Sequence, residues 1–241
     1  MCRVLELARA RAEPALEAYR VYAEGRYGIS RSMERLSSTL APRPSVDPCL
    51  ALEGIQAGVN RGVCILGPST PPSLDGCPAL AGPEPAVYHA LARGRRLLYL
   101  TTDLDMSFRL LGMAEYGSRY KLVHVHGDNH YRLSLAQGWS GVLYTSQVDN
   151  PYTLPLGGFT DGDRAVVIAL ILGAPWVRVL GFHGGVKAWY KDYGLQKEGK
   201  VEVALRIIEH VAAGLGYRVE WRRWGLELIS PRLHDGMGTQ H

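Results

Sequence analysis

The sequence lacks long hydrophobic runs and long basic runs. Its longest apolar stretch, 165–177, lies between Arg164 and Arg178 and is too short to cross a bilayer. No basic and then apolar leader follows Met1, so we expect a cytoplasmic protein without a membrane partner. The formal net charge is +4 at pH 7, and no run of five or more basic residues is present. We therefore expect no nucleic-acid partner.

Cysteine is scarce, and its spacing fits no zinc site. The four cysteines, Cys2, Cys49, Cys64 and Cys77, form no CxxC pair and have no histidine at zinc-finger spacing. We therefore expect buried, reduced thiols. The sequence also lacks an internal repeat, and it lacks low-complexity segments other than its proline-rich loops, which need no functional explanation.

The chain is long enough for one sizeable core, with 241 residues of which 46% are hydrophobic. Residues 13–40 and 49–59 have amphipathic helical spacing, interrupted by prolines at 42–48. We interpret residues 1–58 as an N-terminal helical segment and residues 59–241 as the main domain. The N-terminal helices could cover the sheet or form a homodimer contact.

After residue 59, short apolar runs alternate with helical patterns. This order predicts an α/β fold, with a mostly parallel sheet covered by helices on both faces. The segment 68–85 is rich in proline and glycine and is predicted to be a surface loop. The predicted strands are 62–66, 96–102, 121–126, 141–147 and 177–182, with an edge pair at 217–221 and 226–230, and the predicted helices are 86–93, 107–116, 131–137, 161–172 and 197–215.

Polar residues follow the predicted strands. In open parallel sheets, ligands bind beyond the carboxyl ends of the strands, so these residues are the candidates for a site. They are Gly67-Pro68-Ser69, Thr101-Thr102-Asp103-Leu104-Asp105, His124-Val125-His126-Gly127-Asp128-Asn129, Thr145-Ser146-Gln147 and Gly181-Phe182-His183-Gly184-Gly185.

Three aspartates at two of these strand ends form a candidate magnesium site. Asp103 and Asp105 are two residues apart and would project to one side if the strand pleat continued, and Asp128 follows the next strand. Mg²⁺ prefers carboxylate, water and phosphate oxygens, which such a group provides at a nucleotide site. The alternative is that each aspartate only ends its strand by accepting hydrogen bonds from nearby backbone amides.

Two glycine-containing segments are candidates for phosphate contact. The turn 67–69 could present backbone amides to an anion, although it matches neither GxGxxG nor a Walker loop and could be a plain turn. The segment GGFTDGDRA, 157–165, opens the most hydrophobic helix, and Thr160 with Asp163 fits a capping box. Arg164 in that segment could close over phosphates.

The segment HVHGDNH, 124–130, also suggests a zinc site. It resembles the HxHxDH signature of metallo-β-lactamase-like hydrolases, but Asn129 stands where that family has its third histidine, and His130 is one position late. A zinc hydrolase is therefore one alternative. Buried strand histidines that bond a neighbouring side chain are common without a metal.

Taken in order, GPS at Gly67, TTDLD at Thr101, HVHGDN at His124, GGFTDGDRA at Gly157 and LGF at Leu180 resemble the motif set of the archaeal MptE-like 6-hydroxymethylpterin diphosphokinases. The strand end at 145–147 fits the same order, and the resemblance covers roughly 59–215. It implies a Rossmann-like enzyme that transfers the β,γ-diphosphate of ATP to the hydroxymethyl group of 6-hydroxymethyl-7,8-dihydropterin and releases AMP.

The resemblance also implies roles for individual residues. Asp103, Asp105 and Asp128 would hold Mg²⁺ and, through it, the triphosphate of ATP, and Arg164, or Lys187 in its place, would lie near developing charge. The remaining candidates for contact with ATP or the pterin are Gly67, Pro68, Ser69, Thr102, Asn129, Gln147, Thr160 and Asp161.

One departure from that family and two further alternatives remain. Relatives carry an acidic residue soon after the late strand, where this chain has Gly181-Phe182-His183. A sugar-nucleotide-dependent glycosyltransferase shares the acidic motifs and is the first alternative. A non-catalytic nucleotide-binding module is the other, although clustered carboxylates that repel one another without a metal argue against it.

Overall fold

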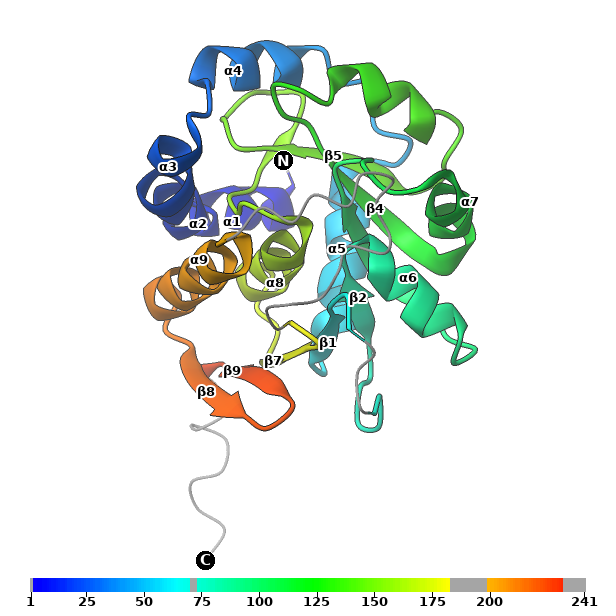
Figure 1. The fold of residues 1–241 in the computed structure, drawn as a ribbon, viewed down its shortest axis with the longest axis vertical. Helices are drawn as coiled ribbons and strands as arrows, with labels where there is room; N and C mark the ends of the chain where they lie inside the picture. Colours follow the sequence, from blue (N-terminus) through cyan, green and yellow to red (C-terminus); the bar gives the residue numbers. More distant parts are fainter. Residues whose placement is uncertain (1, 70–72, 183–198, 232–241) are drawn as a thin grey trace, which may run out of the picture.

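Short aliphatic runs form the strands of one sheet, and amphipathic segments between them form its covering helices (Figure 1). The computed structural model describes residues 2–69, 73–182 and 199–231. The strands are β1 (Val63–Leu66), β2 (Leu80–Gly82), β3 (Leu97–Thr102), β4 (Ser118–His124), β5 (Val142–Ser146), β6 (Leu154–Pro155), β7 (Trp176–Leu180), β8 (Arg218–Arg222) and β9 (Gly225–Ile229). The helices are α1 (Arg3–Arg11), α2 (Glu13–Tyr19), the π-helical η1 (Arg20–Glu24), α3 (Gly25–Tyr27), α4 (Arg31–Thr39), α5 (Pro48–Val59), α6 (Glu84–Leu91), α7 (Phe108–Gly117), the 3₁₀ helix η2 (His130–Ala136), α8 (Asp161–Ile171) and α9 (Lys200–Gly214).

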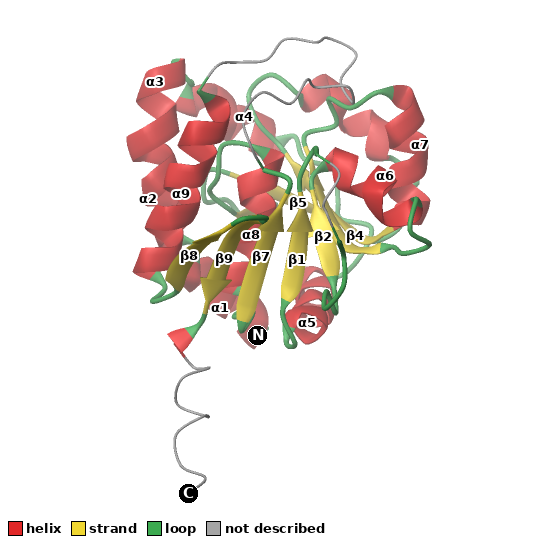
Figure 2. Ribbon diagram, turned by 60° about the horizontal axis from the view of Figure 1, so that its bottom comes forward, coloured by secondary structure: helices red, strands yellow, loops and turns green. Residues whose placement is uncertain are grey.

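The strands form a nine-stranded sheet in the order β6-β5-β4-β3-β2-β1-β7-β9-β8. Neighbours from β6 to β7 pair in parallel, and among the described strands only the pairs β7–β9 and β9–β8 are antiparallel, at one edge. This confirms the predicted mostly parallel sheet and its closing hairpin. The chain runs outward from β1 to β6 and then returns to place β7 on the other side of β1, with Leu66 opposite Leu180. The carboxyl ends of β1 to β5 and β7 therefore meet at one edge (Figure 2).

The prediction of a surface loop over 68–85 is wrong at its end, because β2 lies inside the sheet. Leu80 and Ala81 are buried, and Ala81 pairs with Ile65 on one side and Tyr99 on the other. A strand of three residues is too short to show a period of two, and the prolines and glycines around it are typical of loops. The two-residue β6 was missed for the same reason.

Alternate side chains of the central strand β1 enter two separate cores, as expected for a sheet covered on both faces. Val63 and Ile65 of β1 belong to the core with α5, α8 and α9, whereas Cys64 and Leu66 belong to the core with α6 and α7. Figure 2 shows the two helix layers. Every residue of α8 is buried, which explains its unusual apolar content. Within the described ranges, no helix is both long and apolar enough to cross a membrane.

The helices before β1 pack on the same core as the sheet. Val4, Ala8 and Ala15 share a hydrophobic cluster with α8 and α9. The backbone of α2 closely approaches the segment before α8: a Cβ at Gly157 would come within 2.1 Å of the carbonyl oxygen of Ala15. This contact requires glycine at 157. A division of the chain at residue 58 stays a prediction.

Helix α4 lies at the end of the molecule where the parallel strands point, above the sheet in Figure 2. It begins at Ser30, whose side chain accepts a hydrogen bond from the amide of Met33 at 3.5 Å. Its buried residues are all polar: Glu34, Ser37 and Ser38. We call these three residues the inner face of α4.

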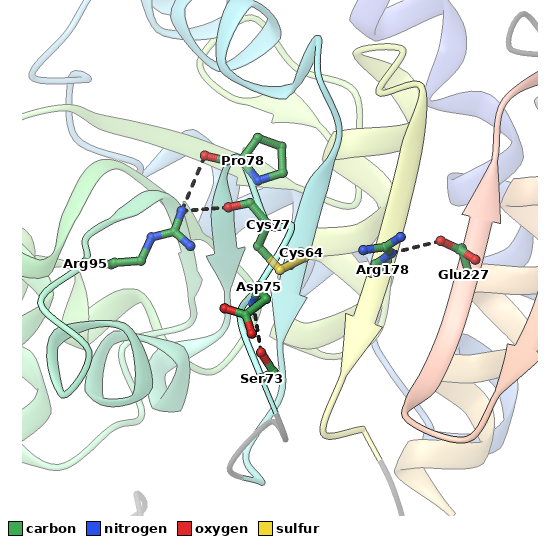
Figure 3. The surroundings of a disulfide bond; sticks show 8 residues. All are labelled: Cys64, Ser73, Asp75, Cys77, Pro78, Arg95, Arg178 and Glu227. Carbon is green, nitrogen blue, oxygen red and sulfur yellow. Dashed lines mark hydrogen bonds and ion pairs between the residues drawn. A yellow bond between two sulfur atoms is a disulfide. The ribbon is translucent and has the colours of Figure 1, made fainter.

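The expectation of reduced thiols is wrong, because the four cysteines form two disulfides, Cys2–Cys49 and Cys64–Cys77. The fold brings each pair to a Cα–Cα distance below 6 Å, 5.9 Å for the first and 5.6 Å for the second. Figure 3 shows the second bond between β1 and the segment before β2, where Arg95 donates to the carbonyls of Cys77 and Pro78. Sequence separations of 47 and 13 residues carry no sign of either pairing.

Candidate active site

Three carboxylates meet at the carboxyl ends of β2 and β3. Glu84 is the first residue of α6, two residues after the end of β2, and Asp103 and Asp105 follow β3. One oxygen from each lies within 4.8 Å of the others. Glu84 is buried, and the two aspartates are half-buried. We call Glu84, Asp103 and Asp105 the acidic group.

The turn after β3 brings the two aspartates together without continuing the strand pleat. The strand ends at Thr102, and Leu104 has a φ of +65°, the only positive φ among the described residues other than glycine. Such backbone is strained for leucine and persists only where its surroundings hold it. The Leu104 amide donates to Thr102 Oγ1 at 2.8 Å, and Thr102 Oγ1 donates to Glu84 at 3.0 Å. Thr102 therefore joins the turn to the acidic group.

Asn129 fastens this turn to the next strand end. Its amide nitrogen donates to the carbonyls of Asp103 at 3.0 Å and His124 at 2.7 Å, and its Oδ1 accepts from the amide of His126 at 3.0 Å. Arg132 adds a bond from Nη1 to the Leu104 carbonyl at 3.1 Å. Asn129, predicted to contact a substrate, thus already has backbone partners on both of its polar atoms.

His126 lies between Asp103 and Asp128. Its Nε2 is 3.6 Å from an Asp103 oxygen, and its Nδ1 pairs with Asp128. Burial lowers the pKa of His126, but the two carboxylates outweigh it and raise the pKa to about 9. The imidazole is therefore protonated at neutral pH.

The Asp128 side chain is 90% exposed and lies outside the acidic group, so the structure brings together two of the three predicted aspartates and adds Glu84.

The N-terminus of α8 forms the capping box that the sequence indicated. Thr160 and Asp163 exchange hydrogen bonds between side chain and backbone. Asp161 is buried and pairs with Arg164 at 3.0 Å, and Arg164 also donates to the Phe159 carbonyl at 3.4 Å. A Cβ at Gly158 would meet the Arg164 side chain at 2.8 Å. Arg164 is thus enclosed within the protein, and the glycine pair serves close packing.

The turn after β1 is tied to the end of β7. The Gly67 amide donates to the Leu180 carbonyl at 2.6 Å, and the Ser69 amide donates to the Gly181 carbonyl at 3.3 Å. A Cβ at Gly67 would come within 2.5 Å of the Gly181 oxygen. Close packing against β7 thus accounts for Gly67, and contact of Gly67, Pro68 or Ser69 with a nucleotide stays a prediction.

The other predicted residues are distributed around this edge. Gln147 donates from Nε2 to the Gly158 carbonyl at 2.6 Å, which links β5 to the segment before α8. His183 and Lys187 lie outside the described residues. His124 is fully buried, with its Nδ1 3.0 Å from Thr145 Oγ1. In the part of the chain that the structure describes, the only metal-compatible group is the acidic group, so His124, His126 and Asp128 are not gathered as a zinc site.

Sequence reasoning missed Glu84 because it missed β2. A usable signal was present: Pro83-Glu84-Pro85 is typical of a helix start, where proline is tolerated and an acidic side chain is favourable. Had Leu80–Gly82 been recognised as a strand, Glu84 would have been one more carboxylate at a strand end.

The acidic group fits a hard divalent cation. It offers three carboxylates, the donors that Mg²⁺ prefers, close enough to repel one another strongly without a compensating charge. His126 compensates part of this charge at Asp103. The group could therefore hold a metal ion at the edge where parallel sheets bind ligands.

Comparison with known proteins points to two archaeal enzymes. The chain is 36% identical over 110 residues to the 6-hydroxymethyl-7,8-dihydropterin pyrophosphokinase of Pyrococcus furiosus, covering 43% of this chain and 47% of that protein. It is 31% identical over 139 residues to the enzyme of the same name from Methanothermobacter thermautotrophicus, covering 52% and 58%. The chain thus spans about half the length of the curated relatives it matches.

A third match is to soluble starch synthase 1 of Solanum tuberosum, 30% identical over 127 residues that cover 53% of this chain and 17% of that protein. No family model matches the chain. The two archaeal matches agree with the family that the motif order indicated. Over about half of its length, the chain is a distant homologue of the archaeal 6-hydroxymethyl-7,8-dihydropterin pyrophosphokinases.

Proposed function

We propose that this protein transfers diphosphate from ATP to the hydroxymethyl group of 6-hydroxymethyl-7,8-dihydropterin and releases AMP. The observation that carries this proposal is the acidic group at the carboxyl edge of a parallel sheet, in a chain homologous to pterin pyrophosphokinases. A phosphate-rich substrate and a divalent cation together match three clustered carboxylates.

In the proposed reaction, the acceptor hydroxyl oxygen forms a bond to the β-phosphorus of ATP. The bond between that phosphorus and the oxygen bridging to the α-phosphate breaks, AMP leaves with its electron pair, and the hydroxyl proton passes to solvent or a nearby base. Such a transfer depends mainly on holding the two reactants in line and on balancing negative charge. Asn129 and Thr102 serve this purpose by fixing the turn that carries Asp103 and Asp105.

Glu84, Asp103 and Asp105 would hold Mg²⁺, which would supply charge neutralisation at the phosphates of ATP. Asp128, predicted as a third ligand, would act on this group through His126, with which it pairs. Arg164 is enclosed beside Asp161 and would contribute positive charge near the phosphates of ATP without contacting them from the surface. Cytoplasmic location, absence of nucleic-acid and membrane partners, and a homodimer stay predictions.

The test is to incubate the purified protein with ATP, Mg²⁺ and hydroxymethyldihydropterin and to quantify AMP and ADP. We expect AMP that depends on both the pterin and Mg²⁺, and its loss in Asp103→Ala. AMP that forms equally without pterin, or an Asp103→Ala protein with full activity and unchanged metal-dependent ATP binding, would contradict the proposal.

The potato match favours a second candidate, a sugar-nucleotide-dependent glycosyltransferase. The diphosphate of a sugar nucleotide would be neutralised at the same acidic group. Release of free nucleoside diphosphate from a sugar nucleotide, together with no AMP from ATP and pterin, would favour this candidate over the first.

A further inference from the structure

Helix α4 turns its polar side inward and its apolar side outward. Met33, Leu36 and Leu40 are 43%, 54% and 56% exposed, whereas the inner face, Glu34, Ser37 and Ser38, is at most 5% exposed. A helix that covers a hydrophobic core shows the reverse pattern. The surface beneath α4 must therefore suit polar groups.

Several buried polar atoms beneath α4 have no partner among the described residues. Glu34 Oε1 accepts a long bond, 3.4 Å, from the amide of Gly127, but Glu34 Oε2 has none. The hydroxyl of Tyr19 and the Nε of Arg164 also have none, and each of these residues is at least 95% buried. Buried polar atoms are almost always paired, and leaving them unpaired is costly. A polar ligand, or water in its place, would complete this cluster.

Glu34 bonds to Gly127, the residue after His126, and the charges of Glu34 and Arg164 both act on Tyr19, so the three side chains lie near one another and near the acidic group. Burial raises the pKa of Tyr19, the charge of Glu34 raises it further, and the charge of Arg164 lowers it. Burial also raises the pKa of Glu34, which the charge of His126 lowers. His126 is in turn 3.6 Å from Asp103. A ligand at Glu34 would thus lie beside the bound ATP that we propose.

We propose that the inner face of α4 is the acceptor site, in which the Glu34 carboxylate accepts hydrogen bonds from the 2-amino group and the adjacent ring N–H of the pterin. This inference rests on the proposed function. The two ring donors lie on one edge of the pterin, and a carboxylate offers two acceptor oxygens at matching spacing. The Tyr19 hydroxyl provides a further hydrogen-bonding group beside them.

In this proposal, α4 moves away from the protein to admit the pterin. The unpartnered oxygen of Glu34 is shielded from solvent, so the acceptor reaches it only when α4 lifts. Gly28 ends α3 with a φ of +61°, and nothing lies within 4 Å of where its Cβ would be, so this link between α3 and α4 is where the chain would bend in the opening that we propose. The turn after β4 approaches α4 closely at Gly127, where a Cβ would come within 2.9 Å of the Met33 Cβ.

The test compares Glu34→Gln with wild type, using hydroxymethyldihydropterin and its analogue with a 2-oxo group in place of the 2-amino group. We expect Glu34→Gln to raise the KM for the pterin about 10²-fold, because an amide presents one acceptor and one donor to two ring donors. The KM for ATP should change less than about threefold. The preference for the pterin over the 2-oxo analogue should fall at least about tenfold, since the amide can donate to the 2-oxo group.

A matched control is Glu13→Gln on α2, whose side chain is 64% exposed and pairs with Arg20 on the surface. It should leave both KM values unchanged. The thermal stability of ligand-free Glu34→Gln should equal or exceed that of wild type, because a buried carboxylate is costly. Equal KM values and equal substrate preference in Glu34→Gln and wild type would overturn the assignment while leaving the diphosphokinase proposal standing.

Direct binding separates the two proposals. Pterin fluorescence is titrated with wild type and with Glu34→Gln, both with Mg²⁺ and a non-hydrolysable ATP analogue, and hydrogen exchange of 31–39 is followed. If wild type binds pterin and protects α4, Glu34→Gln binds it much more weakly, and no AMP forms, the acceptor site is supported and the proposed activity is not. If wild type neither binds pterin nor forms AMP, both proposals fall.

Discussion

The acidic group and the inner face of α4 both lie at the carboxyl end of the sheet, but they satisfy their polar atoms differently. The turn that carries Asp103 and Asp105 is held by Thr102, Asn129 and Arg132, and its charges are partly compensated by His126. Beneath α4, Tyr19, Glu34 and Arg164 keep buried atoms without partners in the described chain.

This difference indicates two kinds of ligand. A cation site needs carboxylates fixed in place before the ion arrives, because their mutual repulsion would otherwise spread them. A site for a neutral, hydrogen-bonding ring needs free donors and acceptors in a buried setting. The following predictions are ordered from the largest expected effect to the smallest.

Removing one charge from the acidic group should have the largest effect. We expect Glu84→Gln and Asp105→Asn each to lower Mg²⁺-supported AMP formation by about 10²–10³-fold, because charge neutralisation at phosphate is the main contribution of such groups. The measurement is kcat/KM for ATP at saturating pterin. Asp149→Asn, an exposed aspartate that pairs with Arg9, is the control. Full activity in Glu84→Gln would remove Glu84 from the site.

The stability of the metal-free protein should depend on His126. Its folded-state pKa of about 9 lies above the ordinary value of 6.5, so the folded state holds the proton more tightly. The resulting stabilisation, up to about 3 kcal/mol, is fully present below about pH 6.5 and is lost as the pH rises through about 9.

Urea denaturation with a chelator, between pH 6 and 9.5, measures this dependence. His126→Gln should be less stable than wild type at pH 6, and the difference in the free energy of unfolding should decrease toward pH 9.5. A constant difference in the free energy of unfolding across that range would show that the two carboxylates do not raise the pKa of His126.

Tyr19→Phe should affect the acceptor site beneath α4 and leave the acidic group unchanged. It removes a buried hydroxyl without a partner in the described chain, so the ligand-free protein should be equally stable or gain up to about 1 kcal/mol. If the hydroxyl meets the acceptor, the KM for pterin should rise about tenfold while metal-dependent ATP binding stays the same. A clear loss of stability in calorimetry, with unchanged KM, would make Tyr19 structural.

Replacing an exposed apolar residue on α4 should have the smallest effect. Leu36→Ser should change the free energy of unfolding by less than about 0.5 kcal/mol, because Leu36 is already 54% exposed. A loss of about 2 kcal/mol or more in denaturation would mean that the outer side of α4 is buried in solution, and therefore that α4 is packed against another copy or another element.

Much of the fold was readable from the sequence because its signals are local. Alternating strand and helix patterns predicted seven of the nine strands in the described residues, and the Thr160–Asp163 spacing predicted the cap of α8. Two strands, β2 and β6, were too short to show a period. The two disulfides were not readable at all, since their partners meet only after the chain has folded.

The sequence by itself determined that polar residues end the parallel strands, since each aspartate follows an apolar run. Only the tertiary structure decided which of them meet. Leu104 adopts a left-handed conformation that brings Asp103 and Asp105 together, and α6 places Glu84 beside them. Asp128 lies outside this group and pairs with His126. The inward polarity of α4 is likewise a tertiary result, because helical periodicity defines two sides of a helix but does not say which side faces the protein.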